Sequence, residues 1–122
     1  MRTGAANPTV SEKASLRETA AVMSTVGRPG AASVIDERGK LVGIFTDGDL
    51  RRLVQRDDID FTRPVSAVMG RHPRTVGPDD LAVTAAEILR EGQIDQLPVV
   101  DGDGRPVGLL DVQDLLSARL FG

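Results

Sequence analysis

The chain of 122 residues contains the same pattern twice. Residues 34–45 read VIDERGKLVGIF and residues 99–110 read VVDGDGRPVGLL, with an offset of 65 at both ends (99 minus 34, 110 minus 45). A duplication limits the fold strongly, because each copy adopts the same supersecondary structure and the copies pack against each other. We therefore expect two similar units, at residues 9–56 and 75–122, with a residual linker at residues 1–8 and an inter-repeat linker at residues 57–74.

Each unit has the residue pattern of a β-α-β-β-α structure. A short extended segment comes before a stretch with apolar residues at helical spacing, and two apolar strands joined by a tight turn come before a last helix. This order predicts the α/β (α+β) fold class. The expected strands are residues 9–10, 32–35 and 41–45 in the first unit and residues 75–76, 97–100 and 107–110 in the second.

The helices are expected to begin at residue types that commonly start helices. These are Ser11, Glu12 and Thr46 in the first unit and residues 78–80 and Asp111 in the second. Apolar residues at helical spacing are expected to form the buried faces: Leu16, Ala20, Met23, Leu50, Leu53 and Val54 in the first unit, and Leu81, Ala85, Ile88, Leu89, Leu115, Leu116 and Leu120 in the second. A short packed helix over residues 64–69 is expected to turn Val65, Val68 and Met69 to the core.

The composition argues against several classes of function. A net charge of −3 gives no basic footprint for nucleic acid, and three Phe as the sole aromatic residues leave little surface for base stacking. The chain has no Cys and a single His, so thiolate and histidine-rich metal sites are not expected. No apolar run approaches the roughly 18 residues of a membrane span and no secretory signal opens the chain, so we expect a cytoplasmic protein.

We expect no catalysis from this chain alone, because it contains no nucleophile–His–acid set, no Walker loop and no metal cluster. His72 lies between Arg71 and Pro73 and is interpreted as a surface or turn residue rather than a catalytic base. The DGDG run at residues 101–104 is interpreted as a turn. A calcium loop would need oxygen ligands where Arg105 and Val112 stand.

The sharpest local signal is the run GIFTDGDL at residues 43–50, where a buried strand leads directly into a helix. Thr46 is placed to cap this helix, and Asp49 is placed to complete a capping box. Taken alone, the run favours a plain cap. A helix start also offers N–H groups and partial positive charge to a phosphate, and Arg51 and Arg52 follow as either added charge or a solvated face.

This run, echoed as GLLDVQDL at residues 108–115, resembles the signature of paired CBS (cystathionine-β-synthase-type) domains. The resemblance covers residues 9–120 and implies two units packed with pseudo-two-fold symmetry around two clefts that bind adenosine nucleotides or related ligands. It implies that Thr46 contacts phosphate and that Asp49, or Asp114 in the second unit, binds ribose. The second cleft departs from the pattern, because Asp111 replaces the hydroxyl residue and a carboxylate repels phosphate.

By the same resemblance, residues of the other half close each cleft, from the segments 69–75 and 96–98. No cofactor and no metal is required. The residues expected to bind the ligand are Gly43, Thr46, Asp47, Asp49, Arg74, Thr75, Leu97, Pro98 and Asp114.

Three runs are also similar to the C-terminal part of bacterial D-arabinose-5-phosphate isomerases: GIFTDGDLRR at residues 43–52, VSAVMGRHPRTV at 65–76 and QLPVVD at 96–101. This similarity implies a parent chain with an N-terminal sugar-isomerase domain, acting in Kdo synthesis for lipopolysaccharide or capsule. The start at Met1 is expected to be a cut at an interdomain linker, with a free-standing protein as the alternative. The implied effector is AMP, ADP, ATP or a CMP-linked sugar acid, and a homodimer through CBS pairs is expected.

Two functions therefore compete. In the first, the chain is a regulatory module, and a nucleotide or nucleotide sugar bridges the cleft and shifts the packing of the units. In the second, the chain is an oligomerisation scaffold with no bound ligand, and Thr46 and Asp49 act only as caps. A nucleotide affinity that depends on these two residues separates the alternatives.

Overall fold

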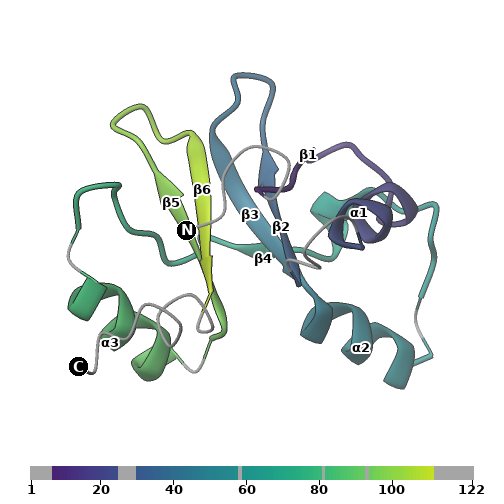
Figure 1. Cartoon of the computed structure of the whole chain (residues 1–122). Helices are drawn as coiled ribbons and strands as arrows, with labels where there is room; N and C mark the ends of the chain where they lie inside the picture. The colour runs from purple at the N-terminus through teal and green to yellow at the C-terminus, as the bar shows by residue number, and fades with distance from the viewer. Residues whose placement is uncertain (1–6, 25–29, 58, 81, 93, 112–122) are drawn as a thin grey trace.

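Two β-hairpins stand side by side in the centre of the molecule, and helices flank them (Figure 1). The computed structural model describes residues 7–24, 30–57, 59–80, 82–92 and 94–111. Within these ranges one sheet has the strand order β1-β2-β3-β4 and the other is the pair β5-β6. The elements are β1 (Thr9–Ser11), α1 (Leu16–Met23), β2 (Ala31–Ile35), β3 (Leu41–Thr46), α2 (Asp47–Gln55), the 3₁₀ turn η2 (Val65–Ala67), β4 (Gly70–Arg71), α3 (Ala82–Gly92), β5 (Gln96–Val100) and β6 (Pro106–Asp111).

The two hairpins match each other in the pairing of individual residues. β2 pairs antiparallel with β3 beginning at Ala31↔Thr46, and β5 pairs antiparallel with β6 beginning at Gln96↔Asp111, a shift of 65 positions (96 minus 31, 111 minus 46). Both hairpins have a register shift at the same place, next to the last pair before the turn. The predicted duplication and the four predicted hairpin strands are confirmed, each strand being slightly longer than expected.

Each hairpin turn is organised by an Asp side chain. Oδ1 of Asp36 accepts hydrogen bonds from two backbone N–H groups of its turn at 2.8 and 3.0 Å, and Oδ1 of Asp101 does the same at 2.9 and 3.0 Å. These bonds, above all the one from the N–H four residues later, hold the pKa of both carboxyls below the ordinary value of 3.8. Gly39 and Gly104 close the turns at φ of 82° and 81°, where glycine is favoured.

The tips of the two hairpins contact each other. The N–H of Leu41 donates to the carbonyl of Gly104 at 2.9 Å, and Nε of Arg105 donates to the carbonyl of Arg38 at 3.2 Å. The predicted turn at residues 101–104 is therefore confirmed and has a structural role. Within the described ranges, no group of acidic, His or Cys residues could hold a metal ion.

Helix α1 begins at Leu16, later than the predicted start at Ser11 and Glu12. Ser11 is still part of β1, so it cannot cap the helix. Ser15 is the N-cap instead, and its Oγ accepts a hydrogen bond from the N–H of Glu18 at 3.1 Å.

Two predictions for the buried helix faces are wrong. Ala20 is half-buried, and Thr19 is fully buried in its place. The Thr19 hydroxyl donates to the carbonyl of Ser15 at 3.0 Å, which satisfies its polar group inside the core. Val54 is 57% exposed, because α2 turns Leu53 inward.

Each repeat has its own apolar core within the described residues. The first core contains Val10, Leu16, Met23, Ala32, Val34, Phe45, Leu53, Val65 and Met69. The second contains Val76, Ala85, Leu89, Leu97 and Val99. No helix in the described ranges has the length and apolar character needed to span a membrane. The last predicted helix, with Leu115, Leu116 and Leu120, and the predicted core residue Leu81 lie outside the described residues.

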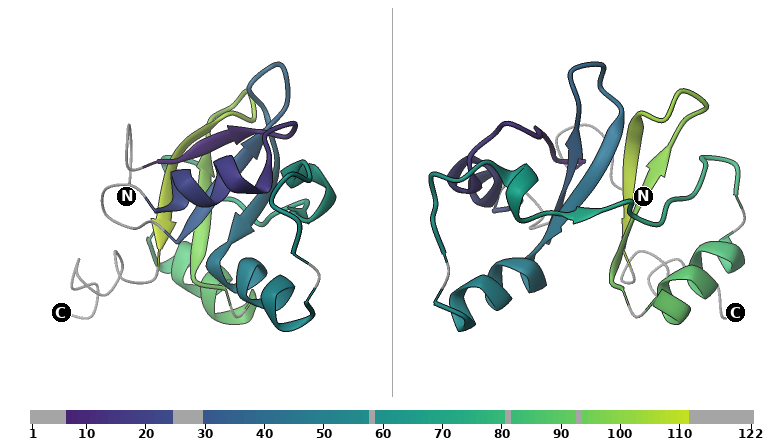
Figure 2. Two further views of the ribbon diagram at one scale, coloured as in Figure 1. Left: turned by 90° about the vertical axis from the view of Figure 1, so that its right-hand side faces the viewer. Right: turned by 180° about the vertical axis from the view of Figure 1, so that it is seen from behind.

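The inter-repeat linker packs onto the first repeat and then crosses the back of both hairpins (Figure 2). η2 brings Val65, Val68 and Met69 to the first core, as predicted for a short helix here. The linker then forms β4, antiparallel to β3, which was not predicted because two residues carry no periodic signal. At this crossing a Cβ on Gly43 would lie 2.8 Å from the carbonyl oxygen of Gly70, so the strands approach closely because residue 43 has no side chain.

Candidate functional site

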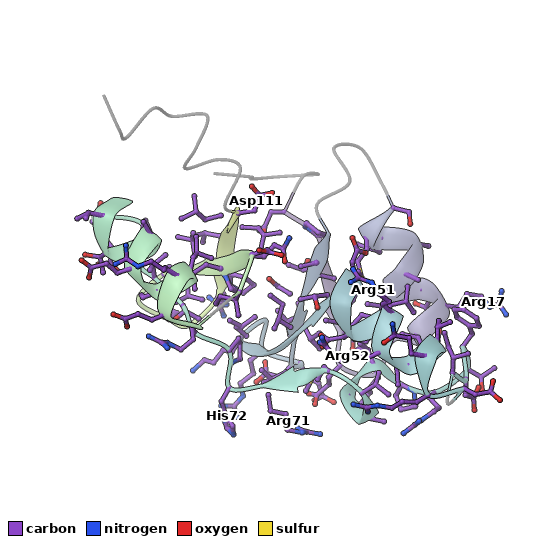
Figure 3. The ribbon with its side chains drawn as sticks, turned by 90° about the horizontal axis from the view of Figure 1, so that it is seen from below. Arg17, Arg51, Arg52, Arg71, His72 and Asp111 are labelled. Carbon is purple, nitrogen blue, oxygen red and sulfur yellow. The ribbon has the colours of Figure 1, made fainter. Side chains whose placement is uncertain are left out.

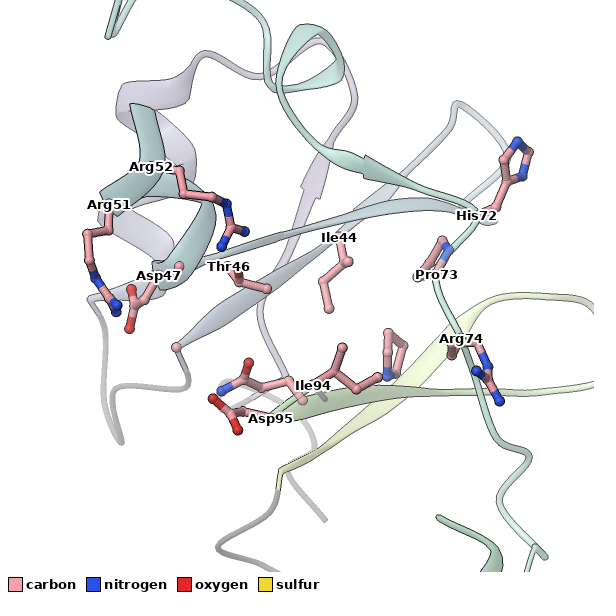
Figure 4. Close-up of a pocket in the computed structure, with 14 residues that line it drawn as sticks. Ile44, Thr46, Asp47, Arg51, Arg52, His72, Pro73, Arg74, Ile94 and Asp95 are labelled. Carbon is pink, nitrogen blue, oxygen red and sulfur yellow. The ribbon is translucent and has the colours of Figure 1, made fainter. Parts of the chain in front are cut away.

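A cavity of about 610 Å³ lies where the two repeats and the linker meet (Figure 4). The cavity lies near those ends of the hairpin strands that are opposite the hairpin turns. The lining residues are Gly30, Ile44, Thr46, Asp47, Gly48, Arg51 and Arg52 of the first repeat, His72, Pro73 and Arg74 of the linker, and Ile94, Asp95, Gln96 and Pro98 of the second repeat.

The first turn of α2 forms one wall of this cavity. Oγ1 of Thr46 accepts a hydrogen bond from the N–H of Asp49 at 3.1 Å, and Oδ2 of Asp49 accepts one from the N–H of Thr46 at 3.0 Å. The predicted capping box is therefore confirmed. The N–H of Asp47 donates to the carbonyl of Gly30 at 2.9 Å. Gly48 is the second residue of α2, so its N–H has no intrahelical acceptor and can donate to a ligand.

Arginine side chains make the cavity positive. Arg51, Arg52 and Arg74 line it together with Asp47 and Asp95, so the lining carries a charge of +1 (three minus two) with the single His counted as neutral. The whole chain, by contrast, has a net charge of −3. The cavity is therefore suited to an anionic ligand, and the helix dipole at the start of α2 adds to this attraction.

The labelled side chains show how the cavity is arranged. In Figure 4 the guanidinium of Arg52 points toward Thr46, whereas the side chain of Arg74 extends from the linker away from Arg51 and Arg52. Figure 3 shows Arg51 and Arg52 on the same helix and His72 at the edge of the molecule. The His72 ring projects away from the centre of the cavity, and its backbone has a φ of 54°. This placement agrees with the prediction of an exposed turn residue.

Four of the residues predicted to bind ligand line the cavity. They are Thr46 and Asp47 at the start of α2, Arg74 in the linker and Pro98 in β5. The structure thus brings together residues that are up to 52 positions apart in the sequence (98 minus 46). Their contacts with a ligand remain a prediction.

The other predicted residues do not line this cavity. Asp49 is turned to the capping box and Thr75 follows the lining residues of the linker. Leu97 is fully buried in the second core, and Gly43 serves the close approach of β3 and the linker. Asp114 lies outside the described residues.

Several lining residues were missed by the sequence interpretation, above all Gly30 and Asp95. The repeat itself contains the signal that would have found them, because the two residues are counterparts (95 minus 30 is 65). Each directly precedes the first strand of its hairpin, β2 or β5. Because the two units face each other, these equivalent positions next to the central strands line the same cavity.

Comparison with known proteins identifies the family. The CBS domain model matches residues 1–56 and 65–120, once in each half of the chain. The chain belongs to the CBS-domain family. A CBS pair is a regulatory module, so this chain is a non-catalytic region.

Several of the similar curated proteins are arabinose 5-phosphate isomerases, which are much longer than this chain. It is 47% identical over 93 residues to arabinose 5-phosphate isomerase KdsD of Pseudomonas aeruginosa, covering 75% of the chain and 28% of that protein. It is 36% identical over 121 residues to arabinose 5-phosphate isomerase GutQ of Salmonella typhi, covering 99% of the chain and 37% of that protein. The chain therefore corresponds to the CBS region of such enzymes and spans about a third of their length.

Solved structures show the same fold over nearly the whole chain. A CBS domain protein from Pyrobaculum aerophilum complexed with AMP matches with a TM-score of 0.82 and 25% identity, covering 100% of both chains. A CBS domain pair in complex with 5′-methylthioadenosine and S-adenosyl-L-methionine matches with a TM-score of 0.78 and 27% identity, covering 95% of this chain and 93% of that one. The predicted fold class and the predicted family are both confirmed.

Proposed function

We propose that this chain is the regulatory CBS pair of an arabinose 5-phosphate isomerase and that its cavity binds a nucleotide or nucleotide sugar. In this proposal the repeats occupy residues 9–56 and 75–122, and the effector is AMP, ADP, ATP or a CMP-linked sugar acid. The parent enzyme works in the cytoplasm as a homodimer and serves Kdo synthesis for lipopolysaccharide or capsule. The likeness to such isomerases and to CBS proteins complexed with adenosine compounds supports this proposal.

The observation that carries the proposal is the meeting of a helix start and three arginines in one cavity. Phosphate binds well at a helix N-terminus because N–H groups and the positive end of the helix dipole face it. Here Gly48, Arg51 and Arg52 line the cavity from the start of α2, and Arg74 lines it from the linker. Arginine adds forked hydrogen bonds to phosphate oxygens, which lysine cannot match.

The remainder of the lining suits the nucleoside part of such a ligand. Ile44, Ile94 and Pro98 provide aliphatic surface, and Gln96 provides an amide that can hydrogen-bond to the edge of a base. No Phe, Tyr or Trp side chain lines the cavity within the described residues, and the His72 ring projects away from its centre, so the base would pack between aliphatic groups. A volume of about 610 Å³ lies within the range that holds small-molecule ligands.

The way the repeats are joined suggests how binding is transmitted. The repeats are tied together at the hairpin tips by the hydrogen bonds from Leu41 and Arg105, whereas the cavity separates them at the other end of the strands. A ligand that contacts both walls favours the arrangement in which those walls are closest. The attached enzyme then responds to a change in the angle between the repeats.

Isothermal titration calorimetry with AMP, ADP, ATP and a CMP-linked sugar acid tests the proposal. We expect one of these ligands to bind to the chain, and we expect Arg74→Ala and Arg51→Ala each to weaken binding about tenfold, the effect of losing one charged hydrogen bond. Arg74 and Arg51 are preferred to Thr46 and Asp49 for this test, because variants of the latter pair also lose the helix cap.

The matched control is Arg90→Ala, which removes an exposed arginine of α3 that does not line the cavity. It should leave the affinity unchanged. Absence of binding by all four ligands would contradict the proposal. A stable dimer in sedimentation experiments, together with that absence, would instead support the oligomerisation scaffold.

A further inference from the structure

The guanidinium of Arg52 is paired with a carboxylate of its own helix. Nη2 of Arg52 donates a hydrogen bond to Oδ1 of Asp49, and the two groups form an ion pair across three positions of α2. The other carboxylate oxygen accepts the N–H of Thr46 in the capping box. Both oxygens of Asp49 therefore have partners within the first two turns of the helix.

Arg52 and Asp49 differ in their access to the cavity. Arg52 lines the cavity and its side chain is 56% exposed, whereas Asp49 does not line it and its side chain is 23% exposed. The guanidinium also lies against the bare backbone of Gly48, since a Cβ built there would be 3.4 Å from Nη1 of Arg52. Arg52 thus stands between the cavity and the carboxylate of Asp49.

We infer that Arg52 is the residue that makes the site select phosphorylated nucleotides over nucleosides. This inference rests on the proposed function together with the ribose contact at Asp49 that the CBS resemblance implies; Asp49 lies one turn behind the lining residue Arg52. A ribose hydroxyl needs a carboxylate oxygen as acceptor, and Arg52 competes for that oxygen. A ligand with a phosphate offers Arg52 a new anionic partner. The guanidinium can therefore leave Asp49 and bind the phosphate instead. A nucleoside offers no such replacement and must displace the guanidinium at a net cost.

The energetics allow this exchange. An exposed pair at this helical spacing contributes little to stability, so Arg52 can leave Asp49 easily. A guanidinium forms charge-assisted, often bidentate bonds with phosphate as well as with carboxylate, so a phosphate can replace Asp49 as the partner of Arg52. Arg52 binds the phosphate and releases Asp49 in the same exchange, so its effect differs between two ligands that share the same nucleoside.

NMR titration of the isotopically labelled chain with AMP and with adenosine tests the inference. We expect Arg52→Gln to weaken AMP binding about tenfold, because a charged hydrogen bond to phosphate is lost. We expect the same variant to bind adenosine about threefold more tightly, because the internal competitor for Asp49 is removed. Arg52→Lys keeps the cation and should restore most of the preference for AMP.

Arg51→Gln is the matched control, since Arg51 lines the same cavity one position away and makes no hydrogen bond to Asp49 within the described residues. It should weaken AMP binding and leave adenosine binding unchanged. Equal weakening of AMP and adenosine by Arg52→Gln would mean a purely structural role and would overturn the inference. If AMP binds the natural chain and Arg52→Gln leaves adenosine unaffected, the inference fails while the proposed function stands. If AMP and adenosine both fail to bind the natural chain, the inference fails, and calorimetry with ADP, ATP and a CMP-linked sugar acid decides whether the proposed function fails as well.

Discussion

The two repeats share one hairpin register but differ in how their first strand is attached. In the first repeat, β1 pairs in parallel with β2 over all three of its residues. At the equivalent place in the second repeat, the described residues show a single parallel bridge, between Val76 and Val99. Since the hairpins match residue for residue, the difference arises at the ends of this parallel pairing.

In the first repeat, hydrogen bonds extend the pairing on both sides. The N–H of Ser33 donates to the carbonyl of Pro8 at 3.0 Å, and the N–H of Glu12 donates to the carbonyl of Ile35 at 2.9 Å. The counterparts of the two donors are Pro98 (33 plus 65) and Pro78 (12 plus 66), which have no N–H to give.

The inner hydrogen bonds of the second repeat are kept. The N–H of Val76 donates to the carbonyl of Pro98 at 3.1 Å, and the N–H of Val100 donates to the carbonyl of Val76 at 2.8 Å. The apolar pattern therefore sets which residues face each other, and proline sets how far the ladder extends. Arg74, the counterpart of Pro8 (8 plus 66), sits where the outer bond is missing, so this wall of the cavity has fewer hydrogen bonds than the wall made by α2.

The largest effect should come from the core of the better-connected repeat. Phe45 is fully buried, whereas its counterpart Leu110 is partly buried. We expect Phe45→Ala to lower the free energy of unfolding by about 3–5 kcal/mol and Leu110→Ala by about 2 kcal/mol. Urea unfolding of the two variants measures the difference. An equal or greater loss for Leu110→Ala would show that the repeats do not differ in this way.

A smaller effect should follow when the first repeat is given the proline of the second. Ser33→Pro removes the N–H that pairs with Pro8, and we expect a loss of about 2 kcal/mol, measured by urea unfolding. The effect stays moderate because this N–H faces β1, and the second repeat accepts proline at the same register.

Ser33→Ala is the control for that substitution. It keeps the N–H and removes an Oγ that is buried without a hydrogen-bond partner among the described residues. We expect stability to stay within about 1 kcal/mol of the natural chain. A loss from Ser33→Ala as large as that from Ser33→Pro would mean that the ladder is not the cause.

The smallest effect concerns the hairpin turns, where the repeats are alike. The lowered pKa of Asp36 and of Asp101 means that the unfolded chain binds more protons than the folded chain once the pH falls through 3.8. The stabilisation of the folded chain by these two carboxylates is therefore complete above that pH. It is lost as the pH falls through the pKa that each carboxyl has in the folded chain. Asp36→Asn and Asp101→Asn should each flatten the decline in unfolding free energy between about pH 5 and pH 2. Unequal flattening would contradict the equivalence of the two turns.

Much of the fold could be predicted because the same sequence pattern occurs in both repeats. The offset of 65 located both hairpins, and the Gly and Asp residues located their turns. β4 could not be found, since its pairing depends on the absence of a Cβ at Gly43 and not on any pattern within the strand. The burial of Thr19 in place of Ala20 was also hidden, because it depends on a hydrogen bond to the carbonyl of Ser15.

The candidate site was predicted less completely for a different reason. Thr46 and Asp47 belong to a recognisable strand-to-helix run, and the capping box followed directly from it. The opposite wall includes single residues such as Ile94 and Asp95, which line the cavity only because the two repeats face each other. Arg52 looked like one of two equivalent arginines in the sequence, and only the geometry separates it from Arg51 by its bond to Asp49.

The central claim is that the cavity between the repeats receives a phosphorylated nucleotide at the start of α2. A crystal structure of this chain grown with AMP tests it most directly. The account predicts electron density for one AMP in this cavity, with the phosphate against the N–H of Gly48 and the arginines of α2 and the linker. Density for AMP elsewhere on the chain would contradict the account, and so would a cavity that stays empty in crystals grown in turn with saturating AMP, ADP, ATP and a CMP-linked sugar acid.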